Sequence, residues 1–459
     1  MKEIDLSRGL IVRTFGFNVP CRRFMLSAKV TRDRRMPLVD EFVLRALKVT
    51  EQLTVGRLAS FFGFSISEVQ TVVADLVSRS LVTVSDEHIH LHSAAQEMFR
   101  TSRDGVPTVM EVESWVEVLW FDLISGSMIP NGIRRGTNFV DIKPPASRES
   151  VSTDFARQAF EENFRDYLTS KRKINDPDAF SLYAVTDVQP TQYGHVAIAG
   201  SEELILFPHP KLQPSLPEVE GNRAQRARKL TEAMRSAYDE LRNPSFSAAA
   251  LGEYCRLTDS TSIQEAILSN GYLDLERWQR LEYGRCAEGV VPLIGAAYLE
   301  RNRQLFRVLI EQSASVEPSR ELEVVWLRPS GSAWGASDDL RALLAEVRAT
   351  TRVGAGRRLA VRTTLVVPAV ERTSHPRRFR KLFEQGILAP PGYLPPALEV
   401  LLVRGRAAIV LVWVQLSESC GVWVGRGTNR PRDIGAIDDQ LQLTNLTANS
   451  KRLWPQRLD

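Results

Sequence analysis

The sequence predicts a multidomain α+β protein: a small helical module near the N-terminus, a mixed middle, and a C-terminal α/β sheet domain. Its 459 residues suffice for about two to four domains with sizeable cores. Residues 36–98 place apolar side chains at helical spacing, whereas from residue 316 onward apolar strands alternate with amphipathic helices. The composition, 43% hydrophobic and 25% charged, is that of an ordinary soluble protein.

Cysteine usage and the N-terminus favour a cytoplasmic protein. The first residues, MKEIDLSRGL, lack the apolar run of a signal peptide. The most apolar stretch, VLLVRGRAAIVLVWVQL, is interrupted by Arg404 and Arg406, so it predicts paired strands and no membrane contact. The cysteines are far apart and form no C-x-x-C pair, which argues against a zinc site and a disulfide framework: Cys21, Cys255, Cys286 and Cys420.

Residues 1–35 predict a basic β arm of two or three strands. They contain nine Lys/Arg and three acidic residues around apolar pieces such as GLIVRTFGF and RRFMLSAKV. Two interpretations remain open here, a solvated edge of a small sheet and an arm that contacts nucleic acid.

Residues 36–100 predict three helices followed by a hairpin. MPLVDEFVLRALKV carries an apolar helical stripe that includes Leu38 and Phe42. TVGRLASFFG follows, with Thr54 as the expected N-cap and Gly63 at the end. The third helix is expected over about 66–79 with a cap at Ser65 or Ser67, and LVTVSDEHIHLHS closes as a two-stranded wing. Six side chains of the third helix are expected to face the core: Ile66, Val69, Val72, Val73, Leu76 and Val77.

This order of helices and hairpin resembles the winged helix-turn-helix superfamily over roughly sixty residues. The resemblance implies that the third helix enters the major groove of DNA. Its outward residues Ser67, Gln70 and Thr71 would then meet bases, with Arg79 nearby. However, residues 64–92 contain four acids and one Arg, few cations for phosphate contacts. Two alternatives stay open: a winged helix that docks a protein, and a helical bundle with an unrelated hairpin.

The wing sequence HIHLH places His88, His90 and His92 on one face of a strand. Alternate strand residues lie about 6–7 Å apart, which makes capture of one ion by all three imidazoles awkward. We therefore expect a solvated wing, no metal site and no cofactor.

The rest of the chain predicts three further regions. Residues 101–215 mix strands with one helix, DFARQAFEENFRDYLTSKRK, and end in the Pro-rich linker HPKLQPSLPEVEG. Residues 216–315 are expected to be mostly helical. Residues 316–459 are expected to form a C-terminal α/β domain with a partly parallel sheet.

The C-terminal segment LEVLLVRGRAAIVLVWVQLSESCGVWVGRGTNRPRD resembles the end of a phospholipase D-like half-domain. GRGTN (residues 425–429) corresponds to the Gly-Ser-x-Asn turn of that superfamily, but the place of its His-x-Lys motif holds hydrophobic residues and Arg. Because the nucleophilic His is missing, the resemblance implies no phosphodiester cleavage. A winged helix joined to such a domain resembles the sugar-responsive TrmB-type regulators. His209-x-Lys211 occurs only in the Pro-rich linker, so we assign it no catalytic role.

Positive charge is concentrated near the C-terminus. Residues 352–432 contain fourteen Lys/Arg and four acids. Such a cluster predicts contact with phosphates, although a solvated helix face is the alternative. The predicted nucleic-acid contacts of this region are Arg372, Arg377, Arg378, Arg380, Lys381, Arg426 and Arg430.

The sequence favours a non-catalytic protein over an enzyme. It contains no GxxxxGK[ST] loop, no HExxH and no GxSxG motif, so no catalytic residue is assigned. The leading hypothesis is a DNA-associated protein, either a regulator or a subunit of a bacterial DNA-processing or phage-defence complex. The alternatives are a scaffold subunit that docks a protein partner or a second copy, and a phospholipase D-superfamily nuclease.

Overall fold

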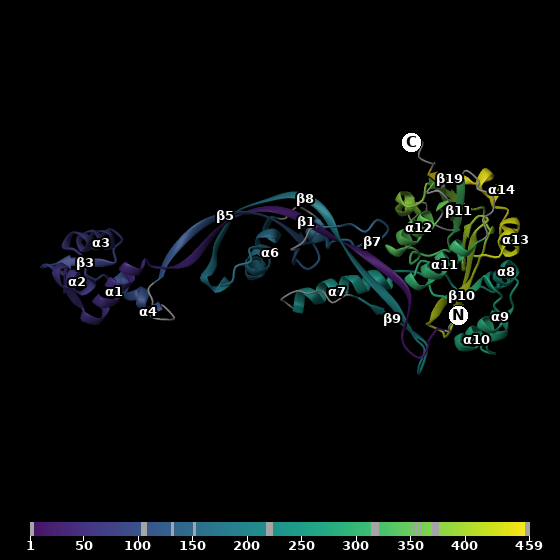
Figure 1. The fold of residues 1–459 in the computed structure, drawn as a ribbon, viewed down its shortest axis with the longest axis horizontal. Helices are drawn as coiled ribbons and strands as arrows, with labels where there is room; N and C mark the ends of the chain where they lie inside the picture. The colour runs from purple at the N-terminus through teal and green to yellow at the C-terminus, as the bar shows by residue number, and fades with distance from the viewer. Residues whose placement is uncertain are drawn as a thin grey trace.

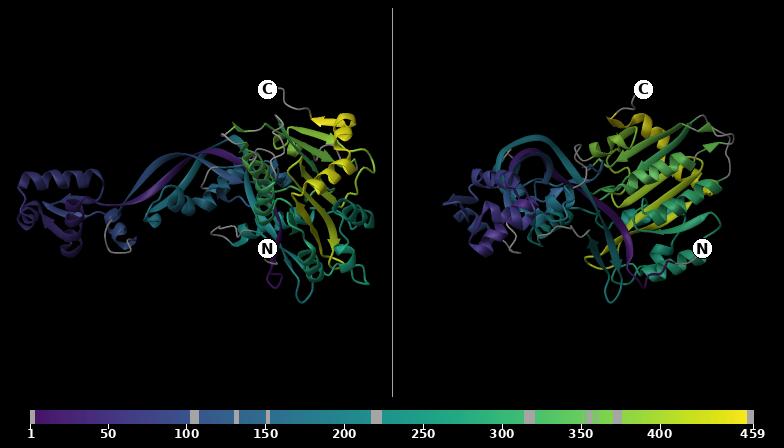
Figure 2. Two further views of the ribbon diagram at one scale, coloured as in Figure 1. Left: turned by 45° about the vertical axis from the view of Figure 1, so that its right-hand side comes forward. Right: turned by 60° about the vertical axis from the view of Figure 1, so that its left-hand side comes forward.

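The protein is an elongated α+β molecule with a helical module at one end, a long curved β arm in the middle and a C-terminal α/β domain at the other end (Figure 1). The rotated views in Figure 2 show the same separation of the two ends. The computed structural model describes residues 4–101, 108–129, 133–149, 153–216, 224–313, 321–350, 352–353, 357–358, 360–369 and 376–454.

The arm is built from two very long antiparallel strands, β1 (Leu10–Arg35) and β8 (Phe180–Ile205). β5 (Thr108–Asp122) pairs with the second half of β1. The prediction of two or three strands in residues 1–35 is wrong, because β1 continues through Pro20. Proline is tolerated there because the pairing of β1 with β5 begins only at Cys21. Short strands complete the sheet: β6 (Met128–Ile129), β7 (Val140–Asp141) and β9 (Lys211–Ser215).

Helices pack along the arm. The distal half packs on α6 (Thr153–Asp166) and the π-helix η1 (Tyr167–Lys171), with Phe24, Trp115 and Phe160 in the shared core. The half nearer the C-terminal domain packs on α7 (Ala224–Asp239). Two short helices complete the middle of the chain: α5 (Ala146–Glu149) and the 3-10 helix η2 (Pro177–Ala179).

Residues 36–101, which we call the tip module, are inserted between β1 and β5 at the far end of the arm (Figure 1). Its small sheet has the strand order β2-β4-β3. Ser65 and Glu68 form a capping box at the start of α3, as the sequence pattern indicates. The elements are α1 (Leu38–Thr50), β2 (Gln52–Thr54), α2 (Val55–Phe62), α3 (Ile66–Ser78), β3 (Val82–Ser85), β4 (His88–Leu91) and α4 (Ser93–Thr101).

The core of the tip module contains fewer of the apolar side chains than the sequence pattern predicts. Val43, Leu44, Leu58, Val69 and Leu76 form it with further apolar side chains. Only part of each apolar stripe is covered, because so small a module has no second layer of elements to cover the rest. Four residues of the predicted stripes are therefore exposed to solvent: Leu38, Phe42, Ile66 and Val77.

The C-terminal domain is built on an eight-stranded sheet of order β10-β18-β17-β16-β11-β14-β15-β19. β11, β14 and β15 are parallel to one another, and the other pairs are antiparallel. Every residue of β16 is buried, so both faces of the sheet are covered. The strands are β10 (Val290–Ile294), β11 (Glu321–Leu327), β14 (Ala360–Val367), β15 (Gln385–Leu388), β16 (Leu398–Val403), β17 (Ala407–Gln415), β18 (Gly421–Thr428) and β19 (Lys451–Trp454).

Two details of this domain differ from the prediction. β10 lies in the region expected to be helical, yet it pairs with β18 at the edge of the sheet. The sequence pattern predicts a helix with a basic face in the segment PRRFRKLFEQG, but the segment forms the short 3-10 helix η4 (Pro376–Lys381) and then β15, with Phe379 and Phe383 buried in the core. β12 (Arg352–Val353) and β13 (Arg357–Arg358) form a separate small hairpin. The helices are α8 (Ala248–Thr258), α9 (Ser262–Ala266), α10 (Leu275–Arg285), α11 (Glu300–Gln312), α12 (Asp339–Thr350), α13 (Pro431–Leu441) and α14 (Leu443–Asn449).

The loop between β11 and α12, residues 328–338, joins the arm to the C-terminal domain. Thr14 of β1 donates its hydroxyl to Asp339 Oδ2 at 2.7 Å, directly after this loop. The buried amide of Asn138 donates to the backbone carbonyls of Gly335 and Ser337. Within the part of the chain that the structure describes, no helix has the length and hydropathy needed to cross a bilayer.

Candidate functional site

The predicted base-reading residues lie on the exposed side of α3. Ser67, Gln70 and Thr71 are all exposed, at the far end of the molecule. The hydroxyl of Thr71 donates to the carbonyl of Ser67 at 3.0 Å, so its proton is already used within the helix. Glu68 beside them accepts hydrogen bonds from Ser65, which hold its pKa below the ordinary value. A carboxylate therefore stays ionised in the middle of this surface.

Arg79 lies at the other end of α3, where two carboxylates hold it. Its Nη1 donates to Asp40 Oδ2 at 2.6 Å and to Asp75 Oδ2 at 3.0 Å. Asp40 is buried at the start of α1, so the ion pair fastens α3 to α1. A guanidinium used in this way offers little to a phosphate, and the prediction of Arg79 as a nucleic-acid contact gains no support from its surroundings.

The tip module as a whole is acidic. Residues 36–101 contain five Lys/Arg and eight Asp/Glu, a formal charge of −3. Asp86 and Glu87 form the turn of the hairpin, where a wing would approach a DNA backbone. Because affinity for DNA depends largely on neutralising phosphates, this charge opposes duplex binding by the tip module alone.

An apolar groove, which we call the tip groove, runs between α1 and α2. Its volume is about 620 Å³. Phe42, Val49 and Phe61 line it, and their side chains are 44%, 83% and 75% exposed. Apolar side chains in a protein core are far less exposed than this. Arg45 and Arg57 lie among the lining residues, and Arg45 pairs with Glu41 at 3.1 Å. The sequence pattern assigned Phe42 to the core, and only the packing reveals the groove.

The tip module carries much of the exposed apolar surface of the described chain. Exposed apolar side chains that gather along one groove, as Phe42, Val49 and Phe61 do, are typical of a site that binds another macromolecule. The exposed large hydrophobic residues of the tip module are Leu38, Phe42, Val49, Phe61, Phe64, Ile66, Val77 and Val84.

The basic cluster predicted around residues 372–381 does not form one surface among the described residues. Arg372 and the side chain of Arg377 lie outside the residues that the structure describes. Arg378 points inward and donates to the carbonyls of Ser332 at 2.9 Å and Trp334 at 2.8 Å. Arg380 and Lys381 are exposed on η4.

Arg426 and Arg430 lie together in a polar pocket of about 470 Å³ in the C-terminal domain. Arg256, Arg285 and Arg432 also line it. The sequence prediction missed Arg256 and Arg285 because they come from α8 and α10, far away in the chain.

Acidic partners reduce the positive potential of this pocket. The buried carboxylate of Glu282 accepts from Arg426 Nε at 2.5 Å. Arg285 pairs with Glu265 at 2.6 Å, and Arg430 lies 3.8 Å from a carboxylate oxygen of Asp433. The pocket therefore contains many guanidinium groups but little net charge.

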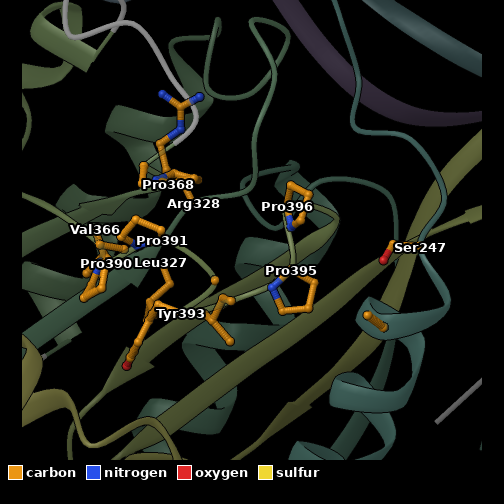
Figure 3. Close-up of a pocket in the computed structure, with 15 residues that line it drawn as sticks. Ser247, Leu327, Arg328, Val366, Pro368, Pro390, Pro391, Tyr393, Pro395 and Pro396 are labelled. Carbon is orange, nitrogen blue, oxygen red and sulfur yellow. The ribbon is translucent and has the colours of Figure 1, made fainter.

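A second pocket of about 420 Å³ lies at the carboxyl ends of β11, β14 and β15. Prolines 390, 391, 395 and 396 surround it together with Tyr393 and Arg328 (Figure 3). The carboxyl ends of parallel strands are a frequent ligand-binding position in α/β proteins. Its lining is largely apolar, so it does not resemble a phosphate site.

Glu399 is buried in the same domain, on β16. The indole N–H groups of Trp326 and Trp334 both donate to its Oε1 at 2.8 Å. Burial raises the pKa of Glu399 to about 7, although the two indole hydrogen bonds and Arg328 act in the opposite direction. The signal in the sequence was a single acid within the apolar strand LEVLLV.

The histidines of the wing lie on a short strand or directly after it. His88 and His90 lie on β4 with ring centroids 6.5 Å apart. Within the described ranges, no three or more His, Cys, Asp or Glu side chains are grouped so that they could hold a metal ion. His209 is exposed in the turn between β8 and β9.

Comparison with known proteins adds little. No family model matches the chain, and no curated protein matches it. One solved structure that matches is described as "Structure of TrmBL2, an archaeal chromatin protein, shows a novel mode of DNA binding". The match covers 91% of this chain and 94% of that one, at 8% sequence identity and a TM-score of 0.21. A TM-score this low does not establish a shared fold, so the function of that protein is not transferred to this chain.

Proposed function

We propose that the protein is a non-catalytic adaptor whose tip groove binds an amphipathic helix of a protein partner. The observation that carries this proposal is the exposure of Phe42, Val49 and Phe61 along one groove of about 620 Å³. A groove between two helices fits a third helix, which would insert apolar residues spaced at i, i+3 or i+4, and i+7. Burying these three side chains would provide a strong hydrophobic driving force.

The charge at the groove specifies the partner further. Arg45 and Arg57 flank the apolar strip on α1 and α2. An incoming helix with acidic residues beside its apolar stripe would complement these two side chains at short range, whereas the negative net charge of the tip module supplies no long-range attraction. A basic helix would be repelled at the same positions, so charge distinguishes the expected partner from other amphipathic helices.

A selection experiment tests the proposal. Displayed helical peptides of about sixteen residues are selected against the full chain and counter-selected against the Val49→Glu, Phe61→Glu double variant. Both side chains are exposed, so the variant should retain its fold, and Val84→Glu on β3 serves as the matched control. We expect enrichment of acidic amphipathic sequences that bind wild type and the control but not the double variant. Enrichment of sequences that bind all three chains equally would refute the groove as the site.

Duplex DNA binding by α3 is a second candidate function. The order α1-β2-α2-α3-β3-β4 resembles that of a winged helix, and Ser67 and Gln70 on α3 are exposed as base-reading residues would be. Titration of duplex DNA across salt concentrations tests it. A salt-dependent affinity and a sequence preference altered by Gln70→Ala would favour this candidate. Binding that is insensitive to Gln70→Ala would exclude α3 as the reading element.

A further inference from the structure

The pocket at the carboxyl ends of β11, β14 and β15 offers little to a charged ligand. Tyr393 donates its hydroxyl to the carbonyl of Leu441, and the guanidinium of Arg328 donates to the carbonyls of Pro329 and Gly331. Among the described residues that line the pocket, none has an acidic side chain. A ligand that carries a charge or many hydroxyl groups would therefore lose its hydration there without gaining matching partners, which is costly.

The rest of the lining suits an apolar ring system. Prolines 390, 391, 395 and 396 contribute ring faces, and aliphatic side chains come from the strand ends. Ser247 lies across the pocket from the first two of these prolines (Figure 3). Its Oγ accepts from the N–H of Ala250 at 3.2 Å, so its own O–H can donate to a ligand. A neutral molecule with one hydrogen-bond acceptor fits this lining, and the volume of about 420 Å³ is within the range of small-molecule sites.

Residues 242–247, between α7 and α8, connect the arm to this pocket. Arg13 of β1 is buried, and its Nη1 donates to Asn243 Oδ1 at 2.9 Å. Ser247, later in the same segment, belongs to the pocket wall. A ligand that contacts Ser247 therefore restrains a segment that also holds the arm.

Residues 328–338 connect the pocket to the arm a second time. The first residue of this loop lines the pocket, and the N–H of Ser330 donates to the carbonyl of Pro396, another lining residue, at 2.9 Å. Near the other end of the loop, the hydroxyl oxygens of Ser337 and of Thr14 on β1 lie 2.7 Å apart. Both segments that touch the arm are thus also walls of the pocket.

We propose that this pocket binds a neutral, largely apolar small molecule with one hydrogen-bond acceptor, and that the bound molecule reduces the motion of the arm relative to the C-terminal domain. The ligand would contact Ser247 and the prolines together and would thereby fix the two segments that hold the arm. Ligand binding and arm contact then strengthen each other, because both stabilise the same arrangement of these segments. The pocket is separate from the tip groove, so the inference does not depend on the proposed function.

Fluorescence titration of the full chain with prodan, a neutral naphthalene ketone, tests the site. Ala249 lines the pocket and Ala248 does not, although both are exposed in the first turn of α8. We expect Ala249→Phe to weaken prodan binding at least about tenfold by filling the pocket, and Ala248→Phe to bind prodan as wild type does. Maltose and an anionic anilinonaphthalene sulfonate should bind in this pocket at least about tenfold more weakly than prodan.

A variant outside the pocket tests the link to the arm. Thr14→Val removes the hydroxyl that contacts Ser337. It should weaken prodan binding by about threefold or more, since the coupling is reciprocal. Thr186→Val, which removes an arm hydroxyl bonded to the carbonyl of Ser27, is the matched control and should leave prodan binding unchanged. Bound prodan should also slow hydrogen exchange in residues 333–338, which do not line the pocket.

Three results would overturn the proposal. One is equal prodan binding by wild type and Ala249→Phe. Another is tighter binding of maltose or of the anionic dye than of prodan in this pocket. The third is an unchanged prodan affinity in Thr14→Val. The Val49→Glu, Phe61→Glu variant should bind prodan in this pocket as wild type does, so failure of the tip groove and failure of this pocket are distinguishable.

Discussion

Replacing Glu399 by Gln should stabilise the C-terminal domain at alkaline pH and have little effect at acidic pH. The carboxyl group is fully buried and accepts two indole hydrogen bonds on Oε1, while Oε2 has no hydrogen-bond partner among the described residues. A glutamine oxygen can accept the same two bonds without a charge. The substitution therefore removes the cost of ionisation and keeps the geometry.

The magnitude follows from the displaced pKa. Burial raises the pKa of Glu399 from its ordinary 4.5 to about 7. Each unit of pKa corresponds to about 1.36 kcal/mol, so ionising this group in the folded chain costs about 3 kcal/mol more than in the unfolded chain. Between these two pKa values the folded state holds the proton more tightly, and stability is lost as the pH rises. Above about pH 7 the loss is complete.

Guanidinium unfolding followed by tryptophan emission measures this effect, because Trp326 and Trp334 both contact Glu399. Near pH 8 the Glu399→Gln chain should exceed wild type in unfolding free energy by up to about 3 kcal/mol, and near pH 4, below both pKa values, the difference should be close to zero. Glu418→Gln, at an exposed position of the same domain, is the control. A difference between wild type and Glu399→Gln that is the same at both pH values would refute the reasoning.

Three further predictions concern folding and the basic residues. Leu76→Asp should unfold the tip module, because an unpaired charge in its core costs several kcal/mol. Limited proteolysis would then cut within residues 36–101. A variant whose tip module resists proteolysis as wild type does would contradict the packing of α3. Ser65→Ala should destabilise α3 by about 1 kcal/mol through loss of its cap, seen as faster amide exchange at the start of the helix. Arg378→Glu should destabilise the C-terminal domain by several kcal/mol because its inward hydrogen bonds are lost, whereas Arg380→Glu on the same turn should stay within about 0.5 kcal/mol. Equal thermal stability of the two arginine variants would contradict the inward position of Arg378.

The sequence predicts local features of the tip module well. The third helix was expected over about 66–79 and spans Ile66–Ser78, because its apolar spacing and the Ser65 cap are both properties of adjacent residues. The exposure of Phe42 and Ile66 could not be predicted in this way. An apolar stripe shows which face of a helix prefers burial, but the stripe does not show whether a neighbouring element covers all of it.

The long arm and the roles of the arginines depend on distant contacts. β1 pairs with β8, and the paired residues are between 148 (Arg32 and Phe180) and 194 (Leu10 and Leu204) positions apart, so neither strand signals its full length locally. Arg79 was predicted as a nucleic-acid contact from its place on the third helix, and Arg426 from the local excess of positive charge. In the folded chain they pair with Asp40 and Glu282. A count of charges along a sequence does not reveal which of them are neutralised by a partner.

The place where the tip module enters the arm has a consequence for how such proteins can diversify. Arg35 is the last residue of β1 and Thr108 the first residue of β5, and these two residues face each other in the β1–β5 ladder. Opposite residues in an antiparallel ladder lie about 5 Å apart. A different recognition module, or a simple hairpin turn, can therefore replace residues 36–107 without moving either strand. The arm and the C-terminal domain would then stay unchanged as a common scaffold, while the module inserted at the tip is exchanged.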